Sequence, residues 1–229
     1  MTTTYQPGGD LAAPNDVRQR RGSAAALAGG SVLTAAALSV HVRGGVADVE
    51  FVRRVEDAPG LWLTGHVLMA VGGILLVLGL IAVPGLARRR GRRAVAVGTG
   101  LSAVGAASTA LGDFAHGSLA YILIGDVSAE QSLKIQEQFY SQPLLAAVSM
   151  PTLLLPLGML VLGGGLLYSR AVPVPAAVLL LVAPITVQLG YMMTSLPMPV
   201  MVLPLVAGLG WVSLVLARRP RRDPSSTDV

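Results

Sequence analysis

The 229-residue chain contains no cysteine. This absence excludes disulfide bonds, thiolate metal sites, cysteine nucleophiles and the covalent attachment of a c-type haem. Charge is scarce as well: charged residues make up 13% of the chain, whereas soluble domains carry about 25%. Hydrophobic residues make up 53%, and the mean hydropathy is +0.66. This composition is typical of an integral membrane protein.

Signatures of several common functions are also missing. Neither a G-x-S-x-G nor an H-E-x-x-H motif occurs, so a hydrolase has no motif in this chain. The net charge of +5 does not indicate a nucleic-acid partner, because the arginines lie in short blocks between apolar runs. No internal repeat supports an inverted-repeat transporter. None of these three classes of protein is therefore indicated by the sequence.

Six apolar segments have the length of about 20 residues that crosses a roughly 30 Å hydrocarbon core as a helix. We therefore expect an all-α, polytopic bundle of six transmembrane helices over residues 23–217. The segments 1–22 and 218–229 are polar, and we expect both to be disordered cytoplasmic tails. The expected spans are 23–42, 61–83, 94–124, 143–168, 171–193 and 196–217.

Basic residues alternate from one connection to the next, and all but Lys134 are arginine. On one side of the expected bundle lie 13 of the 17 basic residues, within 18–21, 88–93, 170 and 218–222. The other side has four, which are Arg43, Arg53, Arg54 and Lys134. The positive-inside rule then predicts a multi-pass protein of the cytoplasmic (inner) membrane with both termini in the cytoplasm.

Two of the outward connections carry helix signals. Ser128 and Gln131 form a capping box, and Ile135 and Phe139 share one face of the segment that follows, so we expect an amphipathic helix near 128–141 on the outer membrane surface. In the earlier loop, valines at 49, 52 and 55 recur every three residues, which is a weaker indication of a second such helix. An ordinary solvated loop is the alternative for each.

Small residues are frequent in the third expected span, including Gly98, Gly105, Ser108 and Gly112. Because small side chains let helix backbones approach closely in lipid, we expect this span to lie at the centre of the bundle.

Polar residues of the spans gather in the outer half of the expected bundle. His66 lies about 7 Å below the outer boundary, and Asp113 lies roughly 28 Å up the third span from its cytoplasmic start. Asp113 and His116 share one helix face, with Thr109 a turn below. An ionisable group inside a membrane is costly and normally has a partner, for which His116 and His66 are the candidates. The set comprises His41, His66, Asp113, His116, Gln188 and Tyr191.

These residues allow several chemistries. The simplest is a structural hydrogen bond between Asp113 and His116 that fixes helix packing. The principal functional hypothesis is an outer pocket that binds a small ligand, a metal or a lipid, with His66, Gln188 and Tyr191 as ligand-binding residues. For a metal, His66, His116 and His41 are the candidate ligands and copper or zinc the candidate ions, and the methionines of "MMTSLPMPVM" would favour Cu(I).

An enzyme is the alternative. Asp113 and His116 would act as a catalytic acid–base pair on a lipid or isoprenoid substrate, in the manner of a small membrane terpenoid cyclase. A component of a proton-coupled transporter is the further alternative, with the same two residues relaying protons. The sequence leaves the substrate and the oligomeric state open.

Two long stretches resemble a set of six-span membrane proteins of actinobacteria with no known activity. They are "APGLWLTGHVLMAVGGILLVLGLIAVPGLARRRGRR" at 58–93 and "PLLAAVSMPTLLLPLGMLVLGGGLLYSRAVPVPAAVLLL" at 143–181. The resemblance covers nearly all of the chain from the first span onward. It implies a six-helix fold in a cell membrane and transfers no site residues.

Overall fold

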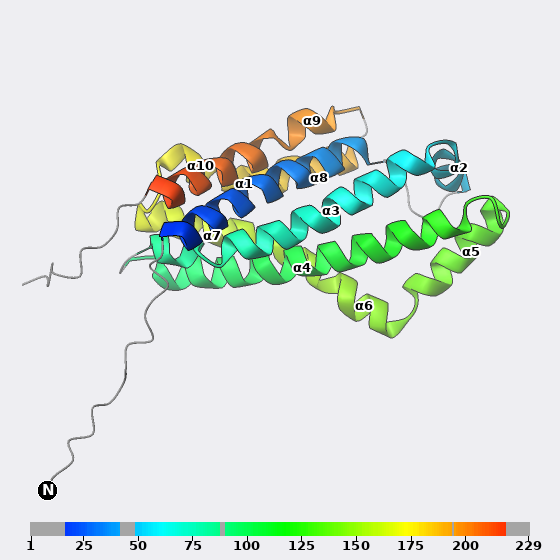
Figure 1. Cartoon of the computed structure of the whole chain (residues 1–229), viewed down its shortest axis with the longest axis horizontal. Coiled ribbons are helices and arrows are strands. Elements are labelled where there is room, and N and C mark those ends of the chain that lie inside the picture. The colour runs from blue at the N-terminus through cyan, green and yellow to red at the C-terminus, as the bar shows by residue number, and fades with distance from the viewer. Residues whose placement is uncertain (1–16, 42–48, 88–89, 194, 219–229) are drawn as a thin grey trace, which may run out of the picture.

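The computed structural model describes residues 17–41, 49–87, 90–193 and 195–218 (Figure 1). All regular structure in these residues is helical. The α-helices are α1 (Val17–Val40), α2 (Val49–Asp57), α3 (Pro59–Leu80), α4 (Arg92–Leu123), α5 (Ala129–Tyr140), α6 (Pro143–Ser149), α7 (Leu154–Ser169), α8 (Val174–Met192), α9 (Met198–Met201) and α10 (Leu203–Arg218), and the 3-10 helices are η1 (Val83–Leu86) and η2 (Met150–Leu153).

Six helical segments of this part of the chain are long and apolar enough to cross a membrane. They are Arg18–Val40, Pro59–Leu86, Arg92–Leu123, Pro143–Ser169, Val174–Met192 and Met198–Arg218. The expected six spans are thereby confirmed, with boundaries shifted by a few residues. The protein is therefore a multi-pass membrane protein by the length and composition of its helices.

The expected tails are shorter than predicted where the structure describes them. α1 begins at Val17, so residues 17–22 are helical and were wrongly included in the tail 1–22. The arginines of this segment are good helix formers and extend the first span by more than a turn. At the other end α10 includes Arg218. Residues 1–16 and 219–229 lie outside the described residues.

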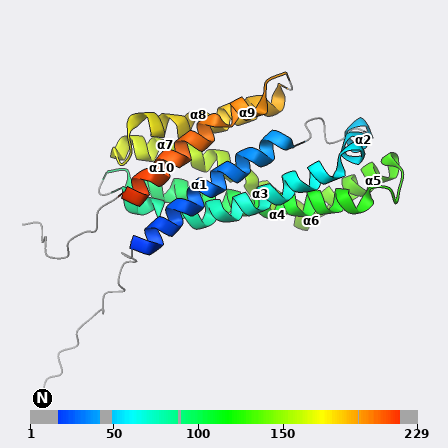
Figure 2. The same cartoon turned by 45° about the horizontal axis from the view of Figure 1, so that its top comes forward.

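The spanning helices pack as a closed ring. In order around the ring, each of α1, α3, α4, α7, α8 and α10 packs against the next, and α10 returns to α1 (Figures 1 and 2). The third span, α4, therefore lies in the ring between α3 and α7, and the expectation that it forms the centre is wrong. Its small residues allow close contact with two neighbours instead of with all of them.

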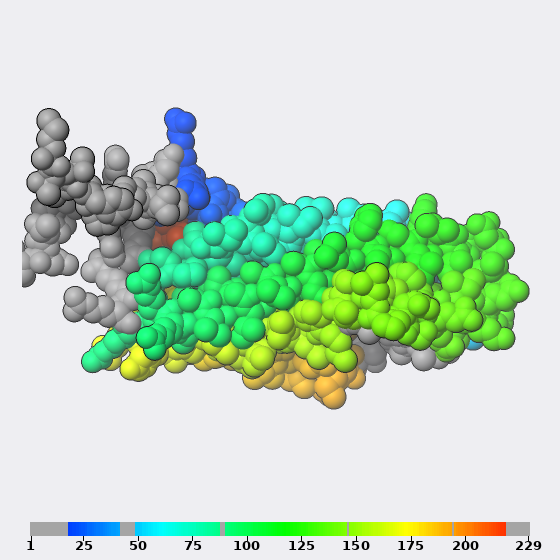
Figure 3. Space-filling view, turned by 90° about the horizontal axis from the view of Figure 1, so that it is seen from below, coloured from blue at the N-terminus to red at the C-terminus, as the bar shows by residue number. Residues whose placement is uncertain are grey.

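Close approaches of the backbone occur where those small residues lie. A Cβ atom added at Gly98 or Gly105 of α4 would collide with the backbone of Leu162 or Leu155 in α7. On the other side, Gly73 of α3 lies against Ala106 and would meet its carbonyl oxygen at 2.8 Å if it carried a Cβ. These contacts fix the separations of α3, α4 and α7. Figure 3 shows the surface of α4 between that of α3 and that of α6 and α7.

The two ends of the ring differ in character. Toward the end where α1 begins and α10 finishes, all six spans contribute to one apolar core that contains Leu27, Leu80, Leu162, Leu180 and Leu209. We call this the arginine-rich end, since the first turns of α1 and α4, the end of α7 and the last turn of α10 carry arginines there. At the opposite end, the histidine end, α6 diverges from α7 and α2 and α5 lie against α3 and α4 (Figure 1).

Candidate functional site

Two short amphipathic helices cover the histidine end of α3 and α4. α2 buries Phe51, Val52 and Val55, and Phe51 and Val55 pack with Trp62 of α3 and Ala120 of α4. α5 lies against both α2 and α4. Helices therefore form at both expected positions, and both pack on protein.

The predicted capping box begins α5. The Ser128 hydroxyl accepts a hydrogen bond from the backbone N–H of Gln131, and the Gln131 side chain accepts one from the backbone N–H of Ser128. The buried side of α5 differs from the expected one: Ser132 and Gln136 are buried, whereas Ile135 and Phe139 are half-buried. Gln136 donates a hydrogen bond to the Ser132 hydroxyl at 3.2 Å. A buried polar face indicates that α5 covers polar groups.

One exposed ion pair links the two covering helices. A guanidinium nitrogen of Arg53 in α2 lies 3.9 Å from a carboxylate oxygen of Glu130 in the first turn of α5. The pKa of Glu130 lies below its usual range, because its own backbone N–H and the Ser128 hydroxyl donate hydrogen bonds to the carboxylate, with a smaller contribution from Arg53. The carboxylate is therefore ionised at neutral pH and becomes neutral only as the solution turns acidic.

The three histidines of the chain come together under this cover. His41 follows α1, His66 is in α3 and His116 is in α4. The ring centroids of His41 and His66 lie 4.8 Å apart, and those of His66 and His116 lie 5.4 Å apart. Three helices distant in sequence thus place their only imidazoles in one row with His66 in the middle. We refer to these three residues with Trp62 and Tyr140 as the histidine cluster.

Aromatic rings enclose the imidazoles. The centroid of Trp62 lies 4.1 Å from that of His66 and 5.2 Å from those of both His41 and His116. Tyr140, the last residue of α5, lies 5.3 Å from His116. His66 and Trp62 are each only 1% exposed. The centre of the cluster is therefore shielded by protein, whereas Tyr140 at its edge is exposed.

The hydrogen bond of His66 fixes which of its nitrogens carries the proton. Nδ1 of His66 lies 2.9 Å from the carbonyl oxygen of Trp62, one helical turn earlier. A carbonyl only accepts, so Nδ1 must donate, and the neutral ring then presents the lone pair of Nε2.

Several buried polar atoms of this end have no hydrogen-bond partner among the described residues. They are Nε2 of His66, Nε1 of Trp62, Nδ1 of His116 and Oε1 of Gln136. Leaving a buried donor or acceptor unpaired costs about 1–3 kcal/mol each. Other unpartnered buried atoms of the described residues include those of Thr34, Arg54, Thr99 and Ser102. Only at this cluster, however, do imidazole and indole nitrogens of the described residues lie together unpartnered, an arrangement that suits a hydrogen-bonding group.

Gly117 provides the space for the central imidazole. A Cβ atom at this position of α4 would overlap the ring of His66. The glycine therefore lets α3 and α4 close on a histidine side chain. Sequence reasoning did not single out Gly117.

Asp113 does not form the expected pair. Among the described residues its carboxylate makes no hydrogen bond or ion pair with His116 or His66, and the side chain is only partly buried. Residues three apart share a helix face, but the His116 ring lies with Trp62, His66 and Tyr140 toward the covering helices. The short aspartate side chain does not follow it there.

Gln188 and Tyr191 lie apart from the histidines. Both are on α8, which packs against α7, α9 and α10, and both are exposed, Tyr191 at 40%. They belong to α8, which in the ring is separated from α3 and α4 by α7 on one side and by α10 and α1 on the other.

The imidazoles do not form a ready metal site. In the part of the chain that the structure describes, no three His, Asp or Glu side chains are grouped so that they would hold a metal ion. The predicted ligands His66, His116 and His41 therefore lie close together as a row of rings.

The sequence analysis missed the aromatic and amide members of the site. Trp62 lies four residues before His66, so the i, i+4 rule places both on one face, and this spacing is the signal that was available. For Phe51, Gln136 and Tyr140 no such signal exists, because their positions depend on how α2 and α5 fold back. Comparisons with protein-family models, curated proteins and solved structures find no match for this chain. The resemblance to six-span actinobacterial proteins therefore stays a prediction.

Proposed function

We propose that this multi-pass membrane protein binds a small neutral ligand that bears a hydroxyl group at the histidine cluster. The observation that carries the proposal is His66: it is 1% exposed, its Nδ1 is bound to a backbone carbonyl, and its Nε2 has no partner among the described residues. A buried acceptor of this kind needs a donor, and a bound ligand can supply one.

The surrounding atoms define the chemistry of the ligand. Nε1 of Trp62 is a donor only, while Nε2 of His66 is an acceptor, and both are unpartnered. A hydroxyl group satisfies both, because it donates one hydrogen bond and accepts another. The rings of Phe51, Trp62 and Tyr140 favour an apolar body beside that hydroxyl. An alcohol with an apolar chain, delivered from the outer leaflet, has these properties.

The distribution of arginines predicts how the bundle is oriented in the membrane. At the arginine-rich end the described basic residues are Arg18, Arg20, Arg21, Arg90, Arg92, Arg93, Arg170 and Arg218. By the positive-inside rule this end faces the cytoplasm, and the histidine cluster then lies at the outer side of a cell membrane.

The test uses the tryptophan of the site as its probe. In a Trp211→Phe background Trp62 is the only tryptophan, so its fluorescence reports on the cluster. We expect dodecanol to shift this fluorescence saturably and methyl dodecyl ether, which cannot donate to Nε2, to bind about tenfold more weakly or not at all. In the His66→Phe variant the two compounds should become equivalent. Equal responses to alcohol and ether in the unmodified cluster would contradict the proposal.

A metal ion is the second candidate, because ligating histidines characteristically donate their other N–H to a carbonyl or carboxylate, as His66 does. The buried, unpartnered imidazole nitrogens among the described residues are His66 Nε2 and His116 Nδ1, and two such ligands suit a two-coordinate Cu(I) better than tetrahedral zinc. Elemental analysis of the purified protein separates the two hypotheses. Near-stoichiometric copper or zinc that both His66→Phe and His116→Phe abolish would favour the metal over the alcohol.

The remaining alternatives have less support. An enzyme that uses Asp113 and His116 as an acid–base pair stays an alternative, with no hydrogen bond between the two side chains among the described residues. A proton-coupled transporter requires a polar path, whereas leucines fill the arginine-rich half of the ring.

A further inference from the structure

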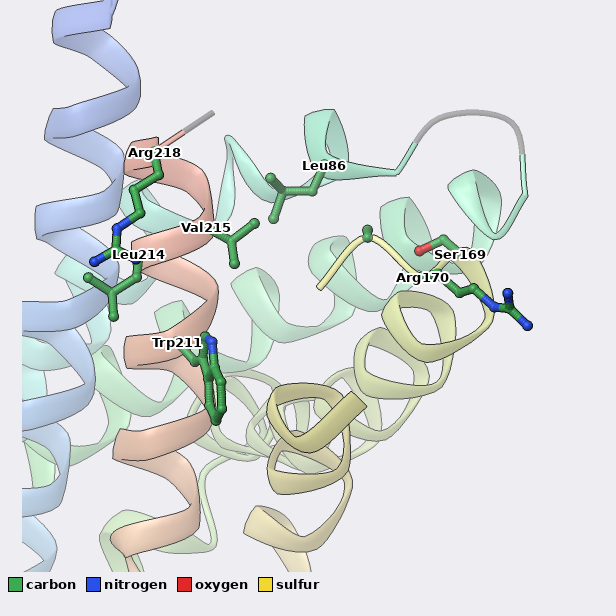
Figure 4. Close-up of a pocket in the computed structure, with 8 residues that line it drawn as sticks. Leu86, Ser169, Arg170, Trp211, Leu214, Val215 and Arg218 are labelled. Carbon is green, nitrogen blue, oxygen red and sulfur yellow. The ribbon is translucent and has the colours of Figure 1, made fainter. Parts of the chain in front are cut away.

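The histidine cluster does not account for a second feature, a cavity at the opposite end of the bundle. The cavity has a volume of about 500 Å³ and lies between α10, η1 and the connection from α7 to α8 (Figure 4). It is lined by Leu86, Ser169, Arg170, Ala171, Trp211, Leu214, Val215 and Arg218. The cavity is thus lined by two arginines, one tryptophan and mostly apolar side chains.

The polar and apolar parts of the lining are separated along the membrane normal. Arg170 follows the last residue of α7 and Arg218 ends α10, so both lie at the ends of spanning helices. Trp211 and Leu214 lie one to two turns deeper in α10, and both are exposed. In Figure 4 the ring of Trp211 reaches into the space below, and the two guanidinium groups extend outward on opposite sides of the opening. A charged rim above an apolar wall matches a headgroup above acyl chains.

Backbone strain holds one of the arginines at this rim. Arg170 has φ 52°, and it is the only residue other than glycine with a positive φ in the described part of the chain. Its N–H and that of Ala171 bond to the carbonyl oxygens of Leu167 and Leu166, as in a helix-terminating Schellman motif. Glycine is the residue that this position prefers. An arginine kept in a conformation that favours glycine indicates a use for its side chain.

The described charges of this end are of one sign. Every acidic residue that the structure describes belongs to α2, the histidine half of α4, or the segment from Asp126 through α5. Among these residues no carboxylate competes for Arg170 or Arg218, and other arginines of α1 and α4 add to the same field. A phosphate group is the ligand that two guanidinium groups select.

From this arrangement we infer that the cavity between α10, η1 and the α7–α8 connection is a binding site for an anionic glycerophospholipid. Its phosphodiester lies at the opening that Arg170 and Arg218 flank, and one acyl chain lies along Trp211 and Leu214. Such basic hollows between spanning helices are a known way for membrane proteins to select anionic lipids. The site is separate from the histidine cluster and does not depend on what that cluster binds.

The test compares lipids that differ only in headgroup charge. Native mass spectrometry of the full chain in detergent, with equimolar dioleoyl phosphatidylglycerol and dioleoyl phosphatidylcholine, measures which lipid stays bound. We expect preferential retention of phosphatidylglycerol, and loss of this preference by about 30-fold in the double variant Arg170→Gly/Arg218→Gln, the ratio that corresponds to about 2 kcal/mol. Glycine suits the backbone at 170, so this variant should remain folded.

A matched control removes the same charge elsewhere. Arg92 and Arg93 in the first turn of α4 are exposed and do not line the cavity, so Arg92→Gln/Arg93→Gln should keep the preference within about twofold. Glycerol phosphate, the headgroup without chains, should not displace the lipid. Equal retention of the two lipids, equal losses in both double variants, or displacement by glycerol phosphate would each overturn the inference.

Discussion

At the scale of single residues, Gly117 decides whether the histidine cluster forms. Replacing it by alanine places a methyl group on the His66 ring, and we expect a loss of about 1–3 kcal/mol in stability, typical of overpacking in a tight interior. We also expect a change in Trp62 fluorescence, measured in the Trp211→Phe background during thermal unfolding. Gly100→Ala on the same helix is the control, because a Cβ there meets nothing within 4 Å. If both variants unfold alike, Gly117 is not a spacer for His66.

At Arg170 we predict a substitution that raises stability instead of lowering it. Its left-handed backbone costs an L-residue about 1–2 kcal/mol, a cost that glycine avoids. The Arg170→Gly variant should therefore unfold at a higher temperature than the natural chain in neutral detergent, where no anionic lipid is present. Arg93→Gly, in the regular first turn of α4, should bring no such gain. A lower unfolding temperature for Arg170→Gly would show that the arginine side chain stabilises the fold by itself.

At the scale of helices, the seam between α4 and α7 depends on glycine. Gly105 faces the backbone of Leu155 so closely that any side chain must separate the helices, while Gly164 on α7 has open space around it. We expect Gly105→Ala to cost about 1–3 kcal/mol, and Gly164→Ala to leave stability unchanged or improve it through helix propensity. Unfolding in a denaturing detergent, followed by loss of helical circular dichroism, measures the difference. Equal effects would mean that α4 and α7 separate easily.

The cover over the histidine cluster is predicted to be held by apolar contacts. Val52 in α2 is 5% exposed, so Val52→Asp buries an unpaired carboxylate and should release α2. Glu130→Gln removes an exposed ion pair while keeping an oxygen that can accept the hydrogen bonds from Ser128 and the backbone, and it should have no measurable effect on α2. Hydrogen exchange of the α2 amides is the readout: fast in the first variant, unchanged in the second. The reverse result would mean that the Arg53–Glu130 ion pair, and not the apolar contact of Val52, holds α2 in place.

Different elements were predictable from the sequence to different degrees. The six spans and α5 follow from local signals, namely apolar length and a capping box, and the structure has both. The heights of His41, His66 and His116 follow from residue counting along each span. Their contact does not, because which faces of α1, α3 and α4 meet depends on Gly65 and Gly117 packing against neighbouring helices. For the same reason the predicted pairing of Asp113 was wrong: helical spacing gives a common face and leaves side-chain direction undecided.

At the scale of the whole molecule, the ring is closed at one half by a continuous apolar core. Leucines from α1, α3, α7, α8 and α10 meet there with 0–2% of their surface exposed. The described buried polar groups at this level include only hydroxyls such as those of Thr99 and Ser102, with no charged side chain, and moving a charge into the layer is costly. We expect proteoliposomes that contain the protein to hold an imposed pH gradient as long as empty vesicles do. A faster collapse, abolished by Asp113→Asn, would restore the transporter hypothesis.

The orientation of the whole molecule is open to a direct measurement because the chain has no cysteine of its own. A single cysteine at Gln138, exposed on α5, or at Arg93, exposed on α4, is then the only thiol present, and the unmodified protein is the blank. The arginine distribution predicts that a membrane-impermeant maleimide labels Gln138→Cys in intact cells and labels Arg93→Cys only after the membrane is opened. The opposite pattern would place the histidine cluster at the cytoplasmic side and the arginine-rimmed cavity outside. A ligand for the cluster would then have to arrive from the cytoplasm, whereas labelling as predicted makes the outer leaflet its source.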